Sequence, residues 1–279
     1  MKNLKTIIIL CAIFFALNAN AQSEKGFYAN LNAGYNKGTA NINYGHALLL
    51  NSVNTTEINA TTTQFEGVAL TFGGGLNFGG NLGYMFNKNI GFELGANYLM
   101  GTDIKSNSTS YLGDFSNRES SAKMLQVRPT LVFRAGYDKI NPYAKIGMLI
   151  GSGKITSSEN GKDASGDTFE EVRELSGGSP IGFHAGLGTL YKISEKISLF
   201  GELNLTSLEY APKKMVLTVF TENGVDQLPT QTVSEKEIEF VDSFTDNSLP
   251  SNPNEPNKFI KFPFSFSSFG LNVGIQYQF

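Results

Sequence analysis

Six ionisable side chains interrupt segments that otherwise alternate between apolar and small residues. They are Glu93, Arg128, Arg134, Lys145, His184 and Glu202. Carboxylates beside lysine or arginine can relay protons, line an ion path or form buried ion pairs, and a histidine can add acid–base or metal chemistry. Which chemistry is available depends on the elements that position these residues.

Period-2 alternation of apolar residues predicts β-strands in eight segments. Each is at least about as long as the ~9–11 residues that a membrane-crossing strand needs. The expected strands are Phe27–Asn36, Leu70–Phe86, Ile90–Met100, Leu125–Tyr137, Pro142–Gly151, Ile181–Tyr191, Ile197–Leu208 and Phe264–Phe279.

The two faces of these strands differ in composition, and this difference indicates what each face contacts. One face carries no Asp, Glu, Lys or Arg, whereas the other is mostly Gly and Asn and holds the six ionisable residues. A lysine or arginine facing lipid at the bilayer midplane would cost about 2–4 kcal/mol, so the uncharged face is expected to meet lipid. The small-residue face then lines a narrow lumen. Six tyrosines near strand ends are expected to form an interfacial girdle: Tyr35, Tyr84, Tyr98, Tyr137, Tyr191 and Tyr277.

The connections alternate between short and long. The short polar turns are Asn87–Asn89, Asp138–Asn141 and Lys192–Lys196, and the long connections are Gly38–Ala69, Gly101–Met124, Ser152–Pro180 and Glu209–Pro263. This asymmetry is typical of an outer-membrane barrel with short periplasmic turns and long extracellular loops. Met215–Thr221 is expected to form a hairpin above the membrane. A ten-stranded barrel is less favoured, because Ser234–Asp242 carries charge on both faces.

The N-terminal 21 residues have the pattern of a cleaved secretory signal. Lys2 and Lys5 precede the apolar stretch Thr6–Leu17, and Ala19-Asn20-Ala21 supplies the small residues of a cleavage site. We therefore expect residues 1–21 to direct export through the Sec route and residues 22–279 to form the barrel. A net charge of -3 gives no reason to expect a nucleic-acid partner, and the single Cys11 excludes a disulfide scaffold.

The inward charges favour a structural plug over an ion path or gate. Glu93, Arg134 and Lys145 lie on consecutive strands at similar heights, so they are expected to neutralise one another in the lumen. Arg128 and Glu202 are expected to pair in a second layer.

The histidines give little support for metal or catalytic chemistry. No second inward His or Cys accompanies His184, which is expected to be a hydrogen-bonded core residue, and we expect no metal or cofactor. His46 lies in the first long connection, where a catalytic group with a serine and an acid is a weak alternative.

The predicted signal, the eight strands and the closing segment Gly270–Phe279 together resemble the OmpA/OmpX-type outer-membrane β-barrel family, also described as porin-like or opacity-type barrels. In that family the last strand ends in an aromatic residue with hydrophobic residues at alternate preceding positions. Val273, Ile275, Tyr277 and Phe279 match this pattern. The resemblance implies recognition of these residues by the barrel-assembly machinery of a Gram-negative bacterium. It also implies contact with outer-membrane lipid and lipopolysaccharide. The chain stops at Phe279, so no peptidoglycan-binding domain is expected.

Three functions are compatible with this all-β, eight-stranded antiparallel barrel. The favoured one is a structural or surface-interaction role, with a lumen largely filled by side chains and long loops that contact an extracellular ligand. The alternative is a narrow porin-like channel for small solutes. The third is an enzyme that modifies lipid or protein at the cell surface.

Overall fold

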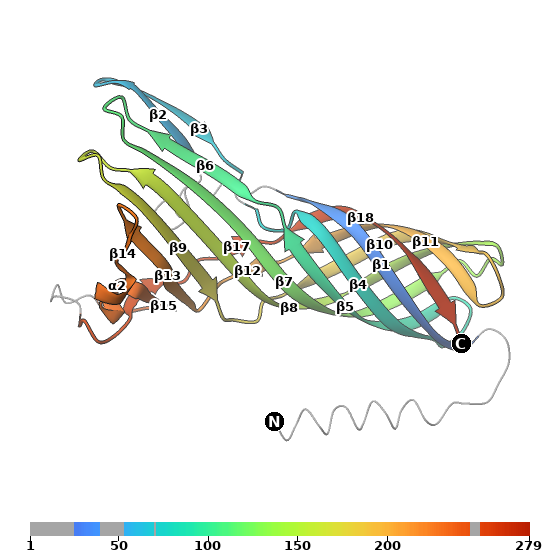
Figure 1. The fold of residues 1–279 in the computed structure, drawn as a ribbon. Helices are drawn as coiled ribbons and strands as arrows, with labels where there is room; N and C mark the ends of the chain where they lie inside the picture. Colours follow the sequence, from blue (N-terminus) through green and yellow to red (C-terminus); the bar gives the residue numbers. More distant parts are fainter. Residues whose placement is uncertain (1–24, 40–52, 70, 246–251) are drawn as a thin grey trace.

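The computed structural model describes residues 25–39, 53–69, 71–245 and 252–279, and most of these lie in strands (Figure 1). Eight antiparallel strands close a barrel: β1 (Gly26–Gly38), β4 (Gly75–Met85), β5 (Ile90–Gly101), β7 (Phe115–Arg134), β8 (Ile140–Lys162), β10 (Ile181–Lys192), β11 (Ile197–Ser207) and β18 (Ser268–Gln278). Neighbours in the chain are neighbours in the barrel, and β18 pairs with β1 to complete the ring. The eight-stranded prediction is confirmed, and the ten-stranded alternative is wrong.

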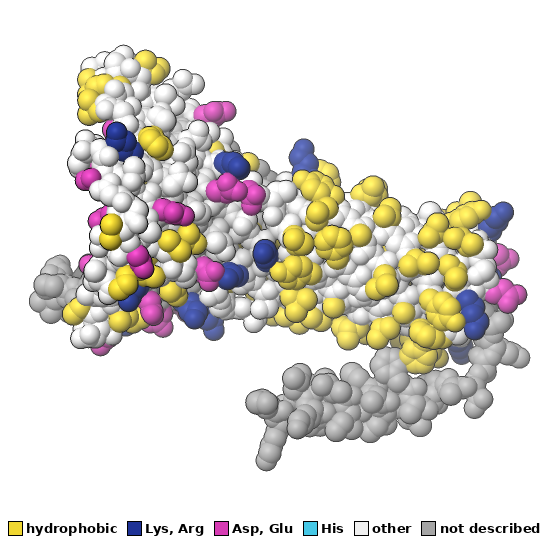
Figure 2. Space-filling model, viewed as in Figure 1, with side chains coloured by type: hydrophobic (Ala, Val, Ile, Leu, Met, Phe, Trp, Pro, Cys, Tyr) yellow, Lys and Arg dark blue, Asp and Glu magenta, His cyan; other side chains and the backbone are white. Residues whose placement is uncertain are grey.

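The predicted outward face of the barrel is exposed. Leu31, Phe183 and Leu187 are 66–68% exposed, whereas alternate residues of the same strands are buried or half-buried. Figure 2 shows the result on the visible face of the barrel as a band of hydrophobic side chains, with charged side chains at its two ends. Such a large exposed apolar surface requires an apolar surrounding, because soluble proteins rarely expose apolar patches of this size.

Short turns join the strands at one end of the barrel. In the β4–β5 turn, the Asn87 side-chain oxygen accepts hydrogen bonds from the backbone N–H groups of Asn89 at 2.8 Å and Ile90 at 2.9 Å. The Ser194 hydroxyl accepts the N–H of Ile197 at 3.1 Å in the β10–β11 turn. Side chains that replace backbone partners in this way explain why these polar residues form tight turns.

At the other end, β7 and β8 continue well beyond the apolar belt. They span 20 and 23 residues, so the predicted boundaries Leu125–Tyr137 and Pro142–Gly151 are wrong at that end. The segments expected to be loops also contain β6 (Ile104–Thr109) and β9 (Thr168–Ser176). Alternation did not reveal these strands because neither face meets lipid there, although backbone pairing continues.

These strands belong to a wall that we call the extension sheet. It comprises the outer parts of β7 and β8 together with eight further strands: β2 (Val53–Asn59), β3 (Thr62–Gly67), β6, β9, β13 (Lys214–Glu222), β14 (Val225–Asp226), β15 (Glu237–Val241) and β16 (Asn257–Ile260). The wall leans away from one side of the barrel (Figure 1). The hairpin expected at Met215–Thr221 is β13 with β14, and it stands in this wall.

Helical structure in the described residues is limited to two short turns, η2 (Leu228–Thr230) and α2 (Val233–Lys236). Among these residues, no helix has the length and apolar character needed to cross a membrane.

An apolar core fills the junction between the barrel and the extension sheet. Phe72, Leu149, Tyr210, Phe264 and Phe266 are at most 2% exposed, and we call this group with its buried neighbours the junction core. Two short strands, β12 (Glu209–Tyr210) and β17 (Phe264–Ser265), pair inside it. The last barrel strand was expected to start at Phe264 but starts at Ser268, because Phe264 and Ser265 pair with β12 and Phe266 is buried in the junction core. Each buried phenylalanine stabilises the junction by about 1.5–3 kcal/mol.

Candidate functional site in the barrel lumen

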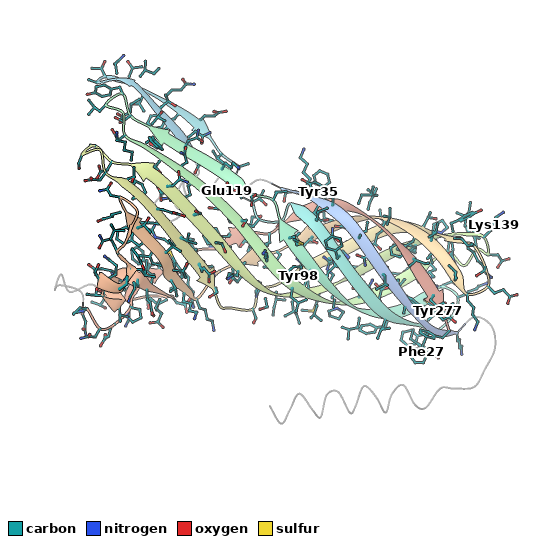
Figure 3. The ribbon with its side chains drawn as sticks, viewed as in Figure 1. Phe27, Tyr35, Tyr98, Glu119, Lys139 and Tyr277 are labelled. Carbon is teal, nitrogen blue, oxygen red and sulfur yellow. The ribbon has the colours of Figure 1, made fainter. Side chains whose placement is uncertain are left out.

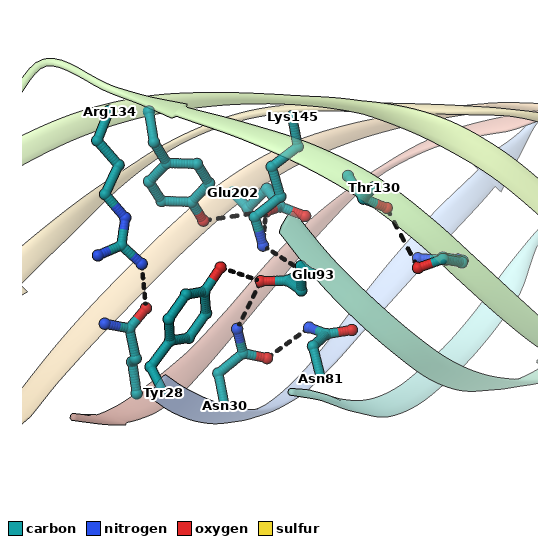
Figure 4. A network of polar contacts seen from close by, with 11 residues as sticks. Tyr28, Asn30, Asn81, Glu93, Thr130, Arg134, Lys145 and Glu202 are labelled. Atoms are coloured by element: carbon teal, nitrogen blue, oxygen red, sulfur yellow. Dashed lines mark hydrogen bonds and ion pairs between the residues drawn. The ribbon is translucent and has the colours of Figure 1, made fainter. Parts of the chain in front are cut away.

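An ion cluster spans the lumen below the junction core. Lys145 on β8 places its Nζ 3.0 Å from Glu93 Oε1 on β5 and 3.2 Å from Glu202 Oε2 on β11. The three side chains are 5–7% exposed. Figure 4 shows that they reach one another from well-separated strands of the barrel wall. The lumen is therefore crossed by a carboxylate–ammonium–carboxylate bridge.

Two tyrosines complete this bridge. Tyr28 Oη donates to Glu93 Oε2 at 3.0 Å, and Tyr143 Oη donates to Glu202 Oε2 at 3.0 Å. Asn30 Nδ2 also donates to Glu93 Oε2, at 3.2 Å. Buried charges are tolerated only when they are paired and hydrogen-bonded. Each carboxylate meets both conditions.

Arg134 lies beside the cluster without joining it. Its Nη2 donates to Gln276 Oε1 at 2.9 Å, and its guanidinium stacks 4.6 Å from the centre of the Tyr28 ring. The structure therefore brings Glu93 and Lys145 together as predicted. The prediction that Arg134 joins their ion pair is wrong, because its side chain follows the turn-side end of β7 toward β18.

The predicted pair of Arg128 with Glu202 is also wrong. Arg128 is 7% exposed and donates from Nη2 to Gln126 on its own strand. Glu202 instead leans over Gly186 on β10, where an added Cβ would lie 3.0 Å from the Glu202 Cδ. Gly186 is the register partner of Lys145, so the missing side chain opens the path from Glu202 to the lysine.

The other lumen glycines make room for aromatic rings. An added Cβ would lie 2.2 Å from the Tyr28 ring at Gly83 and 2.5 Å from the Tyr143 ring at Gly188. These close approaches show why small residues dominate the lumen face. Sequence reasoning counted only charges and so missed both tyrosines. An aromatic residue on an otherwise small-residue face was the available signal.

His184 is buried in the lumen at 4% exposure, and its Nδ1 has no hydrogen-bond partner within the described chain. Over the same residues, no group of three His, Cys, Asp or Glu side chains is arranged to hold a metal. His46 lies outside the described residues, as does the predicted signal segment.

The junction core lies at the outer end of the lumen. Leu99, Met124 and Leu149 point inward from β5, β7 and β8, and they belong to one buried cluster with Phe72 and Phe266. A solute leaving the ion cluster toward the extension sheet would meet packed apolar side chains.

The C-terminal residues of the predicted assembly signal lie on the lipid-facing side of β18. Val273, Ile275, Tyr277 and Phe279 are 40–70% exposed. Figure 3 shows Tyr277 with Phe27 at the turn-side end of the barrel, and Tyr35 and Tyr98 toward the extension sheet. The tyrosines at both ends occupy the positions expected of an interfacial girdle.

Comparison with known proteins identifies the class. The family model described as outer membrane protein beta-barrel domain matches residues 7–233, and the chain belongs to this family. It is an integral outer-membrane β-barrel protein of the Gram-negative envelope, so the short turns face the periplasm and the extension sheet is extracellular.

Individual similarities to solved structures are distant. OprG from Pseudomonas aeruginosa aligns with 13% identity and a TM-score of 0.43, covering 93% of this chain and 99% of that one. Neisserial surface protein A aligns with 9% identity and a TM-score of 0.41, covering 92% and 100%. Ail of Yersinia pestis aligns with 9% identity and a TM-score of 0.29, covering 93% and 100%. A search of curated proteins gave no significant match.

Proposed function

We propose that this protein is a surface-interaction protein whose filled barrel anchors the extension sheet in the outer membrane. The observation that carries the proposal is closure of the lumen at two levels. Lys145 bridges two carboxylates within it, and the junction core packs over its outer mouth. An eight-stranded barrel has an interior just wide enough for side chains to fill it.

The far end of the extension sheet supports a role in contact. Ile58 and Phe65 on the β2–β3 hairpin are 57% and 70% exposed, and Leu112 in the β6–β7 turn is 70% exposed. Ser110 Oγ donates to Glu57 Oε2 at 2.9 Å, which ties this hairpin to this turn. These exposed apolar side chains are available for contact with a protein or a membrane.

A narrow channel is the second candidate, because ionisable side chains line the lumen. Conduction would require Lys145 to leave both carboxylates and the junction core to open. The enzymatic alternative gains no support from His184, which is buried in the lumen.

The C-terminal strand and the apolar belt each support an inference about a partner. Its outward aromatic and aliphatic residues fit the assembly signal that the family resemblance implies, so we infer recognition by the barrel-assembly machinery. The exposed apolar belt fits contact with outer-membrane lipid.

The surface role is tested with cells that display the wild-type protein or the variant I58S/F65S/L112S. We expect the variant to lose most of the wild-type gain in adherence to other cells or to extracellular matrix. I193S, which removes an exposed apolar side chain from a periplasmic turn, is the matched control. Equal adherence of wild type, variant and non-expressing cells would contradict the proposal.

A further inference from the structure

A pocket lies at the periplasmic end of the barrel, on the side of the ion cluster away from the junction core. It has a volume of about 310 Å³ and reaches from the three short turns to the buried side chains of Met85, Leu190 and Gln276. Leu190 and Gln276 also line the small space beside the ion cluster. The pocket is therefore the periplasmic mouth of the lumen, and we call it the vestibule.

Positive charge dominates the wall of the vestibule. Each of the three turns contributes one exposed lysine, Lys25 contributes another immediately before β1, and Arg134 lies on β7. The lysines of the turns are Lys88, Lys139 and Lys192. Figure 3 labels Lys139 at this end of the barrel. The acidic side chains in the wall are Asp138 and Glu195, so the cations remain in excess even when the carboxylate of the last residue, Phe279, is added.

These five cations have no ion-pair partner within the described part of the chain. Every ion pair found there involves a different lysine or arginine. The Nε of Arg134 is buried and donates to no described group, although Nη2 donates to Gln276. Lys145, a short distance deeper in the lumen, is held by two carboxylates. Positive charge is thus compensated in the ion cluster and uncompensated in the vestibule.

We propose that the vestibule binds an acidic peptide segment of a periplasmic protein. Charge complementarity selects an anionic occupant, and cations spread over three turns suit several carboxylates better than one. The volume lies at the lower end of the range for ligand pockets, about 300–1,000 Å³, so it admits a short extended segment but no folded domain. The side-chain amides of Asn141, Gln276 and Gln278 in the wall suit the backbone of such a segment. The site lies at the opposite end of the barrel from the extension sheet, so the inference is independent of the surface role.

The test measures binding of a fluorescent tetraglutamate peptide to the folded protein in detergent at low salt, by fluorescence anisotropy. Each exposed ion pair contributes about 1.5- to 5-fold in affinity, so K88Q/K139Q/K192Q should bind about tenfold more weakly than wild type. The matched control K123Q/K214Q/K258Q removes three exposed lysines from the extracellular side and should bind like wild type. A tetraglutamine peptide should show no binding to any of the three proteins.

Three outcomes would overturn the proposal. The first is equal affinity of K88Q/K139Q/K192Q and wild type for tetraglutamate. The second is an equal loss in K123Q/K214Q/K258Q, which would reduce the binding to an effect of net charge. The third is displacement of the peptide by an equal concentration of glycerol phosphate, which would assign the vestibule to a phospholipid headgroup. Heat-modifiability verifies that each variant is folded, and the three lysines are replaced singly if the triple variant is not.

Discussion

The barrel and the extension sheet are built from the same strands but satisfy opposite surroundings. In the barrel, β7 and β8 present apolar residues outward and polar residues inward, because lipid surrounds them. In the extension sheet, the same two strands carry polar residues on both faces. There they pair with further strands to form a broad sheet. Charge follows the same division. Glu93, Lys145 and Glu202 of the barrel are buried and paired with one another, whereas the charges of the extension sheet lie at or near the surface. The comparison shows that one hairpin, β7–β8, can both cross the membrane and form part of a solvent-exposed sheet.

The largest expected effect comes from breaking the ion cluster. Lys145→Met leaves Glu93 and Glu202 buried without their cation and should lower the free energy of unfolding by about 3–5 kcal/mol. Urea unfolding of the folded protein in lipid vesicles measures this loss. Lys154→Met in the extension sheet breaks an exposed ion pair and should change stability by less than about 1 kcal/mol.

A rescue variant sharpens this comparison. E93Q/K145M/E202Q removes all three charges and should recover much of the stability that K145M loses. If K145M and K154M lower the free energy of unfolding equally, the distinction between the buried ion cluster and the solvated extension sheet is wrong.

A smaller effect is expected from two glycines on neighbouring strands. Gly186→Ala places a Cβ 3.0 Å from the Glu202 carboxyl carbon and should destabilise the barrel by about 1–3 kcal/mol. Gly201 faces lipid and has no atom within 4 Å of an added Cβ, so Gly201→Ala is the matched control and should be near neutral. Thermal melting of the two variants compares them, and equal melting temperatures would count against a packed lumen.

The smallest effect concerns pH and the extension sheet. Burial alone would raise the pKa of Glu159, but hydrogen bonds from Ser116 and Arg118, with the charges of Arg118 and Arg173, lower it overall. A carboxyl with a depressed folded-state pKa contributes stability that is complete above its unfolded pKa of about 4.5 and is lost as pH falls through the folded value. Amide exchange at the outer ends of β7 and β8 should therefore accelerate on acidification below about pH 4.5.

The control for this prediction is Glu159→Gln, which should exchange faster than wild type at neutral pH and lose the acid-dependent change. Acid acceleration that persists unchanged in E159Q would assign the effect to another group.

Alternation predicted the barrel strands because lipid on one side and a crowded lumen on the other impose opposite demands on successive residues. It could not predict β6, β9 or the outer ends of β7 and β8, where both faces are polar and strand pairing leaves no periodic trace. The pairing of Glu93 with Lys145 followed from charge sign and height. That of Glu202 did not, because it depends on Gly186 opening a path across β10, and this requires the register. Phe264 and Phe266 were included in the last membrane strand because they are two residues apart, which is also the spacing of side chains on one face of a strand.

Single-channel recording in planar bilayers tests the central claim most directly. With the ion cluster and the junction core in place, the wild-type barrel should show no steady conductance at any applied voltage, while insertion is verified by protection from protease. A stable ohmic current from the inserted wild-type protein would contradict the filled lumen on which the account depends.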